Sequence, residues 1–474
     1  MTGCCAGDPA ASYDLAILGA GGAGFSAAVI AAEVGARVAL IGHGTIGGTC
    51  VNVGCVPSKT MIRAGEALYG ARAAARFDGL VGEAHVVDWR RLIAAKDNLV
   101  ADLRRAKYVD LLAGYDAISY IEGPARLADG GVTTAGKLIR ATKIIVATGA
   151  RPALPAIPGL AKVPVLTSTS FLELEARPES LIVLGGGFIG TELAQMMARM
   201  GTDVTIVCRT RLLPHAEPEV SAALMQVFRD EGIQVHCAVE YGVCRRTERG
   251  VTLQLRDHGR DTEIDAEWLL VATGRSPNVE QLGLHEAGVV QDARGYIAVD
   301  DRMRTSRKNV YAAGDVIGKD QFVYMAAHGG KVAVQNALNG DSVAYSNFAM
   351  PWVVFTDPQV AGVGLTEAGA RASGHQVKTS LINLDQIPRA RAARDTRGLI
   401  KLVADARSDR LLGGQILAPE GADSIQTLVL ALKHEMTARQ LAETIFPYLT
   451  TVEGVRLAAQ GFDRDIHKLP CCAG

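Results

Sequence analysis

The stretch DLAILGAGGAGFSAAVIAAEVGARVALIG, residues 14–42, decides the fold of this chain. An apolar run leads into a glycine-rich turn, and a helix of small residues separates that turn from a second apolar run. Gly19, Gly21 and Gly24 match the GxGxxG pattern, in which glycine lets the backbone approach a pyrophosphate at a helix N-terminus. The stretch therefore predicts a strand–turn–helix–strand unit that binds a dinucleotide.

The same pattern occurs a second time in SLIVLGGGFIGTELAQMMARMGTDVTIVCR, residues 180–209. Two further stretches, 137–152 and 266–278, are also similar to each other, because each contains an apolar run that ends in Ala-Thr-Gly and is followed closely by an arginine. Two turns, each between an apolar strand and a helix, predict two dinucleotide sites. The residues singled out by this duplication are Gly185, Gly187, Gly190, Thr148, Gly149 and Gly274.

Composition narrows the class of protein. The net charge is −1, so no broad basic field indicates nucleic acid or an anionic membrane as a partner. We expect no membrane span, because no stretch is long and apolar enough, and no signal peptide. Nine cysteines, some at redox spacing, indicate thiol chemistry in a reducing cytoplasm.

Two pairs of cysteines carry the expected chemistry. Cys50 and Cys55 lie in GGTCVNVGCVPSK, residues 47–59, at a spacing that can open and close as a disulfide. Pro57, Ser58 and Lys59 indicate a helix start beside Cys55, where a thiolate is favoured. Cys471 and Cys472 are adjacent, which disfavours a disulfide between them but suits a soft metal ion.

These motifs, in this order, resemble the two-dinucleotide flavoprotein disulfide reductases over nearly the whole chain. The resemblance implies an α/β fold with two Rossmann-like dinucleotide-binding domains and a C-terminal α+β dimerisation domain, in a homodimer that uses FAD and NAD(P)H. The domains expected are a tail (1–12), an FAD-binding domain (13–157 and 277–346), an NADPH-binding domain (158–276) and a dimerisation domain (347–474).

The resemblance also implies roles for single residues. Cys50 would be the interchange thiol and Cys55 the thiolate that faces the flavin, with Lys59 paired to Glu192 nearby. Phe188 would stand over the nicotinamide pocket, and Asp315 would bind the ribityl chain of FAD. The other residues implied to bind the two cofactors are Gly19, Gly21, Gly24, Gly48, Thr49, Thr148, Gly149, Gly185, Gly187, Gly190 and Gly274.

Two positions depart from the usual nucleotide-binding pattern. Gly42 stands where an acid that binds the adenosine ribose of FAD is expected, and His43 is a candidate replacement. Cys208 stands at the corresponding position of the second unit, followed by Arg209 and Arg211. Arginines there suit a 2′-phosphate, so NADPH is expected rather than NADH.

A third departure concerns the substrate. The family's C-terminal histidine base is replaced by Tyr448 in FPYLTTVEGVRLAAQ, whereas Glu453 keeps the position of its glutamate partner. A phenol is a poor base at neutral pH, so reduction of organic disulfides is disfavoured. This replacement and the Cys-Cys tail together resemble the mercuric ion reductases, in a form without an N-terminal metal-binding domain.

That resemblance implies a function. Hg(II) would be received by Cys471 and Cys472 of one subunit and passed to Cys50 and Cys55 of the other, in active sites shared across a homodimer. NADPH would then reduce it through FAD to Hg(0), as mercury detoxification in the cytoplasm.

Several alternatives remain at this stage. The protein could be a large-type thioredoxin reductase, another low-molecular-weight disulfide reductase such as a mycothione or lipoamide reductase, or a thiolate buffer that only sequesters Hg(II). Cys4 and Cys5 are either a metal-handling pair or exposed thiols on a tail. The last three cysteines, Cys208, Cys237 and Cys244, show no ligand-type spacing and are expected to be structural.

Overall fold

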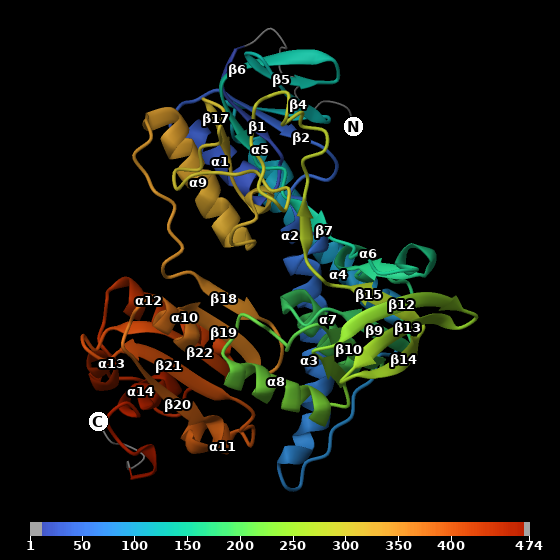
Figure 1. Ribbon diagram of the computed structural model, residues 1–474, viewed down its shortest axis with the longest axis vertical. Helices are drawn as coiled ribbons and strands as arrows, with labels where there is room; N and C mark the ends of the chain where they lie inside the picture. The colour runs from blue at the N-terminus through green and yellow to red at the C-terminus, as the bar shows by residue number, and fades with distance from the viewer. Residues whose placement is uncertain (1–11, 469–474) are drawn as a thin grey trace. The chain divides into compact units, whose positions relative to one another are not determined.

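The computed structural model describes residues 12–468 (Figure 1). These residues form two compact units, each built from three segments of the chain. The first unit contains the described residues up to Ser58, then 90–153 and 274–347, and the second contains 59–89, 154–273 and the described residues from Phe348 onward. The cysteines expected at the ends of the chain, Cys4, Cys5, Cys471 and Cys472, lie outside the described residues.

The first unit is organised around a seven-stranded sheet. Its central strands are parallel and almost continuously apolar, as expected for strands that are buried on both faces. In pairing order the strands are β3 (Ile118–Glu122), β2 (Val38–Gly42), β1 (Tyr13–Leu18), β6 (Lys137–Val146), β5 (Gly131–Thr134) and β4 (Ala125–Ala128), with β17 (Val310–Ala312) also paired to β6. A separate ribbon pairs β7 (Ala150–Pro152) with β16 (Arg275–Pro277).

Two helices of this unit, α1 (Gly22–Glu33) and α9 (Val323–Asn339), lie side by side against the sheet (Figure 1). Their close approach depends on Gly330, because a Cβ at that position would overlap the carbonyl oxygen of Ala23. The short helix η4 (Asp315–Ile317) follows β17. These elements place the first glycine turn and Asp315 at one end of the sheet's central strands.

The segment that carries Cys50 and Cys55 folds as two helices, α2 (Gly48–Val53) and α3 (Cys55–Arg72). Only Gly54 separates them. The chain continues through η1 (Ala73–Arg76), α4 (Trp89–Arg104), the π-helical turn η2 (Arg105–Val109) and α5 (Asp110–Leu112).

The second unit contains a second parallel sheet of five strands and a three-stranded antiparallel sheet. The parallel strands, in order, are β11 (Gln234–Cys237), β10 (Asp203–Cys208), β9 (Ser180–Leu184), β15 (Trp268–Val271) and β8 (Val165–Thr167). Its helices are η3 (Leu160–Lys162), α6 (Ser168–Phe171), α7 (Phe188–Arg199) and α8 (Pro218–Asp230). The antiparallel strands are β12 (Glu240–Thr247), β13 (Gly250–Asp257) and β14 (Arg260–Ala266).

The C-terminal part of this unit is a five-stranded antiparallel sheet covered by helices. The strand order is β18 (Pro351–Val354), β19 (Gln359–Gly364), β22 (Leu411–Ala418), β21 (Leu399–Asp405) and β20 (Val377–Asn383). Helix α12 (Gly421–Lys433) packs on β18, β19 and β22, and α14 (Glu453–Gln460) packs on β20 and β21. The remaining helices are α10 (Glu367–Ala372), η5 (Leu384–Gln386), α11 (Pro388–Ala392), α13 (Ala438–Glu443) and η6 (Ile466–Lys468).

A buried network of charges, which we call the Tyr69 cluster, joins the three segments of the second unit. Arg199 stacks 3.8 Å from the ring centre of Tyr69, and its guanidinium donates to both oxygens of Glu231, at 2.8 and 2.6 Å. It also donates to Asp357 Oδ2 at 2.8 Å. The cluster is completed by Arg397, which donates to Glu231 and Asp395, and by Arg76, which donates to Asp395.

The predicted fold class is confirmed, because the chain combines two Rossmann-like parallel sheets with a C-terminal α+β layer. The boundaries predicted for the four domains stay predictions. Within the described residues, no helix is long and apolar enough to cross a membrane.

Candidate active site

The two glycine turns pack in the same way. Gly19 has a φ of +112°, and a Cβ on it would overlap the carbonyl oxygen of Ala147, which precedes Thr148 and Gly149. In the second turn Gly185 has a φ of +113° and makes the corresponding approach to Ala272. In both turns the third glycine (Gly24 or Gly190) has its Cα against the carbonyl of the first, so no side chain fits there.

FAD fits the first turn. The turn leads directly into α1, whose N-terminal amides suit a pyrophosphate. Asp315 lies 3.4 Å from Arg275 Nε, and burial raises the pKa of its carboxyl although the guanidinium charge opposes that rise. A buried acid of this kind suits the ribityl hydroxyls of FAD, and Gly314, with a φ of +79°, turns the chain into it.

The missing acid at Gly42 has a structural explanation. A Cβ at Gly42 would lie 2.5 Å from the hydroxyl oxygen of Tyr120, a residue of the neighbouring strand β3. The phenol therefore occupies the space that a glutamate side chain would need. Tyr120 was not singled out in the sequence, because the partner strand of Gly42 cannot be identified without the sheet order.

Cys50 and Cys55 occupy two adjacent helices, and Cys55 is the first residue of α3. Gly54 allows the chain to double back between them, since a Cβ there would lie 2.9 Å from Thr49 O and 3.3 Å from the Cα of Cys50. Cys50 is half-buried and Cys55 is exposed. Helix N-termini stabilise negative charge, so the position of Cys55 favours a thiolate.

The start of α2 rests on the first nucleotide-binding turn. Gly48 has a φ of +66°, and a Cβ on it would lie 2.6 Å from the Cα of Gly21. Asn52 holds this helix by donating to the carbonyl oxygens of Ile46 and Gly48, at 2.9 Å each. Helix α2, which carries Cys50, is thereby fixed beside the expected FAD site.

Two tyrosines that the sequence did not indicate lie within electrostatic reach of the cysteines. Burial raises the pKa of Tyr108, and nearby negative charge on Cys50 and Cys55 raises it further. Burial also raises the pKa of Tyr324, with smaller contributions from Asp320 and Cys55. Both phenols therefore stay protonated at neutral pH. Tyr108 lies in the π-helical turn η2, which has no sequence signature, and its ring packs edge-on against Phe25 at 4.8 Å.

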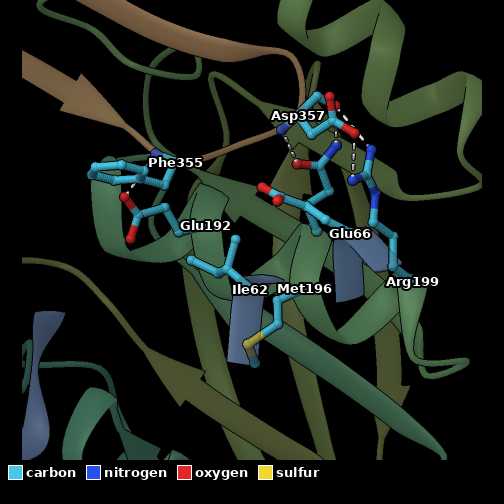
Figure 2. Close-up of a pocket in the computed structure, with 8 residues that line it drawn as sticks. Ile62, Glu66, Glu192, Met196, Arg199, Phe355 and Asp357 are labelled. Carbon is cyan, nitrogen blue, oxygen red and sulfur yellow. Dashed lines mark hydrogen bonds and ion pairs between the residues drawn. The ribbon is translucent and has the colours of Figure 1, made fainter. Parts of the chain in front are cut away.

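The expected pair of Lys59 and Glu192 is present. Lys59 Nζ lies 2.7 Å from Glu192 Oε2, and the other carboxylate oxygen accepts the backbone N–H of Phe355 at 2.9 Å. The ammonium also lies 4.9 Å from the ring centre of Phe355. Figure 2 shows Glu192 beside Phe355, at a small pocket that Ile62, Glu66, Gln195, Met196, Arg199 and Asp357 also line.

Phe188, the first residue of α7, follows the second glycine turn. Its ring stacks on Trp352, with 5.4 Å between ring centres and an interplanar angle of 25°. The ring is thus supported on one side by a strand of the C-terminal sheet.

The two arginines expected to bind a 2′-phosphate differ in their surroundings. Arg211 donates to the carbonyl oxygens of Pro214 and Ala216, at 3.0 and 2.6 Å, within its own loop. Arg209 is exposed, directly after Cys208 at the end of β10. Arg209 is therefore the better placed of the two to meet a phosphate, and Arg211 shapes the loop.

Glu453 is buried at the first turn of α14, and burial raises the pKa of its carboxyl. Its Oε2 accepts the backbone N–H of Leu449 at 3.1 Å, which fixes the loop after Tyr448. About half of the Tyr448 surface is exposed.

Comparison with protein families agrees with this architecture. The family model described as pyridine nucleotide-disulphide oxidoreductase matches residues 13–337, and the model of that family's dimerisation domain matches residues 350–459. The dimerisation match supports a homodimer.

Individual relatives are similar over almost the whole chain. A mercuric reductase of Streptomyces lividans is 43% identical and covers 98% of both chains. A mercuric reductase of Shigella flexneri is 44% identical over 97% of this chain and 82% of its own. Among solved structures, the HOCl-induced flavoprotein disulfide reductase RclA of Escherichia coli, in a Cu(II) complex, superposes with a TM-score of 0.84 at 30% identity, covering 95% of this chain and 99% of its own.

Proposed function

This chain belongs to the pyridine nucleotide-disulphide oxidoreductase family, and on that premise we propose that it reduces Hg(II) to elemental mercury with NADPH. The observation that carries the proposal is the 43% identity to a mercuric reductase over 98% of both chains. The arrangement of Cys50 and Cys55 at two adjoining helices supports it, because Hg(II) prefers thiolate ligands.

In this proposal Cys50 and Cys55 hold the substrate as a bis-thiolate. Bound FAD would supply the route by which two electrons from NADPH reach the metal, so the products would be NADP⁺, one proton and Hg(0). The start of α3 stabilises the negative sulfur of Cys55. The protonated phenols of Tyr108 and Tyr324 donate hydrogen bonds to the thiolates. Lys59, held by Glu192, keeps a positive charge one helical turn beyond Cys55.

Delivery of the metal completes the proposal. Cys471 and Cys472 of one subunit capture Hg(II) from its thiol complexes and pass it by ligand exchange to Cys50 and Cys55 of the other, with Tyr448 lining the path. The reaction serves mercury detoxification in the cytoplasm. Because two thiolates of the protein bind Hg(II) at each step, exogenous thiols do not hold it in a dead-end complex.

The acceptor decides between this function and its rivals. Purified FAD-loaded protein is assayed for NADPH oxidation with Hg(II) in excess thiol, beside oxidised glutathione and oxidised thioredoxin as separate acceptors. We expect NADPH oxidation with Hg(II) as the acceptor and none with either disulfide. Turnover with a disulfide in place of Hg(II) would make the protein a disulfide reductase like its structural relatives, and binding of Hg(II) without NADPH oxidation would make it a buffer.

Two sets of variants test the thiol pairs. Cys50→Ala and Cys55→Ala should each abolish Hg(II) reduction while leaving FAD bound, and only Cys55→Ala should also remove the long-wavelength absorbance of the two-electron-reduced protein. Cys471→Ala/Cys472→Ala should lose most turnover with a bis-thiolate but keep more with the bromide complex. Mixed dimers of a tail-dead and a Cys50/Cys55-dead subunit should regain one working site. Wild-type turnover of thiol-bound Hg(II) by the tail-dead protein would overturn the delivery step.

A further inference from the structure

Two strands that end beside the second glycine turn each carry a cysteine, and these two cysteines are in contact although they are far apart in the sequence. Cys208 ends β10 and Cys237 ends the neighbouring parallel strand β11, and the two residues are register partners. The thiol of Cys208 donates to Cys237 Sγ at 3.3 Å. Adjacent strands hold partner Cα atoms about 4.8 Å apart, inside the range that a disulfide spans, so a bond needs the sulfurs to rotate and no strand to move.

The two sulfurs are also anchors for the loop that carries Arg209 and Arg211. The single S–H of Cys208 is shared between Cys237 Sγ and the carbonyl oxygen of Thr210, which lies 3.2 Å from the Cys208 sulfur. Cys237 also accepts the backbone N–H of Leu212. Cys208 packs beneath the glycine turn as well, because a Cβ at Gly186 would lie 3.1 Å from its Sγ. The backbone N–H of Leu213 then ties the loop to Gly186 O at 2.7 Å.

The pair is asymmetric in the way that redox-sensing cysteines are. Cys208 is buried and Cys237 is partly exposed. The hydrogen bond from Cys208 lowers the pKa of Cys237, with help from the Leu212 N–H and Arg229, against burial and the charge of Asp257. The same hydrogen bond, together with burial, raises the pKa of Cys208. An accessible thiolate beside a protonated resolving thiol is the arrangement that oxidants attack first.

We propose that Cys208 and Cys237 form a second redox dithiol, a modification site that hydrogen peroxide converts to a disulfide and that thereby weakens binding of the pyridine nucleotide. The Cys237 thiolate attacks one peroxide oxygen, giving a sulfenic acid and hydroxide. The Cys208 thiol then displaces the sulfenic oxygen, forming the S–S bond and releasing water. The two cysteines lose two electrons and peroxide gains them.

The structural consequence follows from the distances. An S–S bond is about 2.05 Å long, so the sulfurs must close in from 3.3 Å. Cys208 then has no hydrogen to donate to Thr210 O, and Cys237 loses the negative charge that the Leu212 N–H stabilises. Both changed contacts lie in the loop of Arg209, so the loop and the turn at Gly186 must readjust. The effect on NADPH rests on the proposed function, whereas formation of the disulfide does not.

Peptide mapping tests the bond itself. FAD-loaded protein is treated with hydrogen peroxide, the remaining thiols are alkylated, and tryptic peptides are analysed by mass spectrometry. Cleavage after Arg199, Arg209, Arg229 and Arg245 gives peptides 200–209 and 230–245, which contain Cys208 and Cys237 respectively. We expect them cross-linked, with fragment ions that place the bond at Cys237 and not at Cys244 of the same peptide. The cross-link should form in Cys244→Ala and be absent in Cys237→Ser. Failure to form it in wild-type protein at peroxide doses that oxidise Cys50 and Cys55 would overturn the proposal.

Nucleotide binding tests the consequence. The Kd for NADP⁺ is compared for peroxide-treated wild type and peroxide-treated Cys237→Ser, in both of which Cys50 and Cys55 are oxidised. We expect the Kd of the wild type to rise severalfold, that of Cys237→Ser to stay unchanged, and dithiothreitol to restore the wild type. An equal Kd in cross-linked and reduced protein would overturn the link to the nucleotide. Absence of NADP⁺ binding by reduced protein would contradict the proposed function, and the peptide mapping would then decide the disulfide on its own.

Discussion

Glu192 receives Lys59 on one carboxylate oxygen, at 2.7 Å, and the backbone N–H of Phe355 on the other, at 2.9 Å. Only 5% of Glu192 is exposed, so the lysine is held by a carboxylate that is itself fixed. Helix α3 begins at Cys55 and reaches Lys59 after one turn, whereas Glu192 lies in the helix that follows the second glycine turn. One ion pair thus connects the thiol helix to the second nucleotide-binding motif.

Replacing Glu192 by glutamine should reduce Hg(II) turnover about tenfold, since a charge-assisted hydrogen bond contributes about 1.5–3 kcal/mol and 1.4 kcal/mol is a tenfold change in rate. Glutamine can still accept from the Phe355 N–H, so the melting temperature should fall by only a few degrees. The measurement is kcat for NADPH oxidation with Hg(II)-thiol, beside the Kd for NADP⁺. Glu66→Gln, in the same pocket, is the matched control and should behave as wild type. A Glu192→Gln protein with unchanged kcat would show that the ion pair has no part in the reaction.

Tyr108→Phe should lower turnover about tenfold or more, because a hydrogen bond to a charged group such as a thiolate contributes about 1.5–3 kcal/mol. The phenol is protonated, half-buried and close enough to Cys50 and Cys55 for their charge to raise its pKa. Its removal should also raise the pH at which the thiols ionise, so the acid limb of the kcat profile should move upward. Tyr115→Phe, which removes an exposed hydrogen bond to Glu33, provides the control. A profile that coincides with wild type would exclude Tyr108 from the thiol site.

Replacing each of the two arginines after Cys208 should affect the selectivity for NADPH over NADH differently. Arg209→Gln should raise the KM for NADPH about tenfold or more and leave the KM for NADH unchanged, as expected when a charge-assisted contact to a 2′-phosphate is lost. Arg211→Gln should raise both KM values together, because Arg211 holds the carbonyl oxygens of Pro214 and Ala216. Equal use of NADPH and NADH by the wild type would contradict the assignment while leaving the two-nucleotide architecture intact.

The Tyr69 cluster should make stability depend on acid pH. Burial opposes the charged form of Asp395, but hydrogen bonds and the charge of Arg397, with that of Arg76, lower its pKa overall. A carboxylate whose pKa is lowered by folding stabilises the protein above its unfolded pKa, about 3.9, and loses that effect as the pH falls through the folded value. Asp395→Asn should therefore lower the melting temperature at pH 7 by roughly 5 °C, the size expected for breaking a buried pair.

The pH series gives the sharper readout for Asp395. The difference in melting temperature between wild type and Asp395→Asn should be constant from about pH 5 to pH 8 and shrink below about pH 4. Asp78→Asn removes an exposed pair with Arg394 in the same unit, and surface pairs of this kind contribute little, so it is the control. A difference that persists undiminished to about pH 2.5 would mean that the charge of Asp395 is not what stabilises the cluster.

The fold was accessible from the sequence wherever local pattern decides it. The glycine turns could be predicted because a Cβ at Gly24 or Gly190 would overlap a backbone carbonyl, a constraint that only glycine satisfies. The pairing of Lys59 with Glu192 came from resemblance to a family, since 133 residues separate them and no local pattern links them.

The remainder depended on which strands become neighbours. Tyr120 fills the space beside Gly42, and Cys237 lies beside Cys208, only because β3 joins β2 and β11 joins β10. The approach of Tyr108 to the thiols depends on a π-helical turn after α4, a geometry without a residue signature. Sequence spacing carries no information about such lateral contacts, and the expectation that Cys208 and Cys237 are merely structural thus overlooked their contact.

The Tyr69 cluster also constrains the order in which the protein can be made. Its members come from α3, from the end of α7 with the residue after α8, and from the C-terminal part of the chain. During synthesis Arg199 and Glu231 leave the ribosome well before Asp357 and Arg397. Until then the two early residues lack some of their charged partners, and burying them in that state costs free energy. The second unit should therefore close only after the C-terminal sheet emerges. The finished unit, once closed, should tolerate a protease cut in the exposed stretch 79–81, because both sides remain tied to the same buried charges.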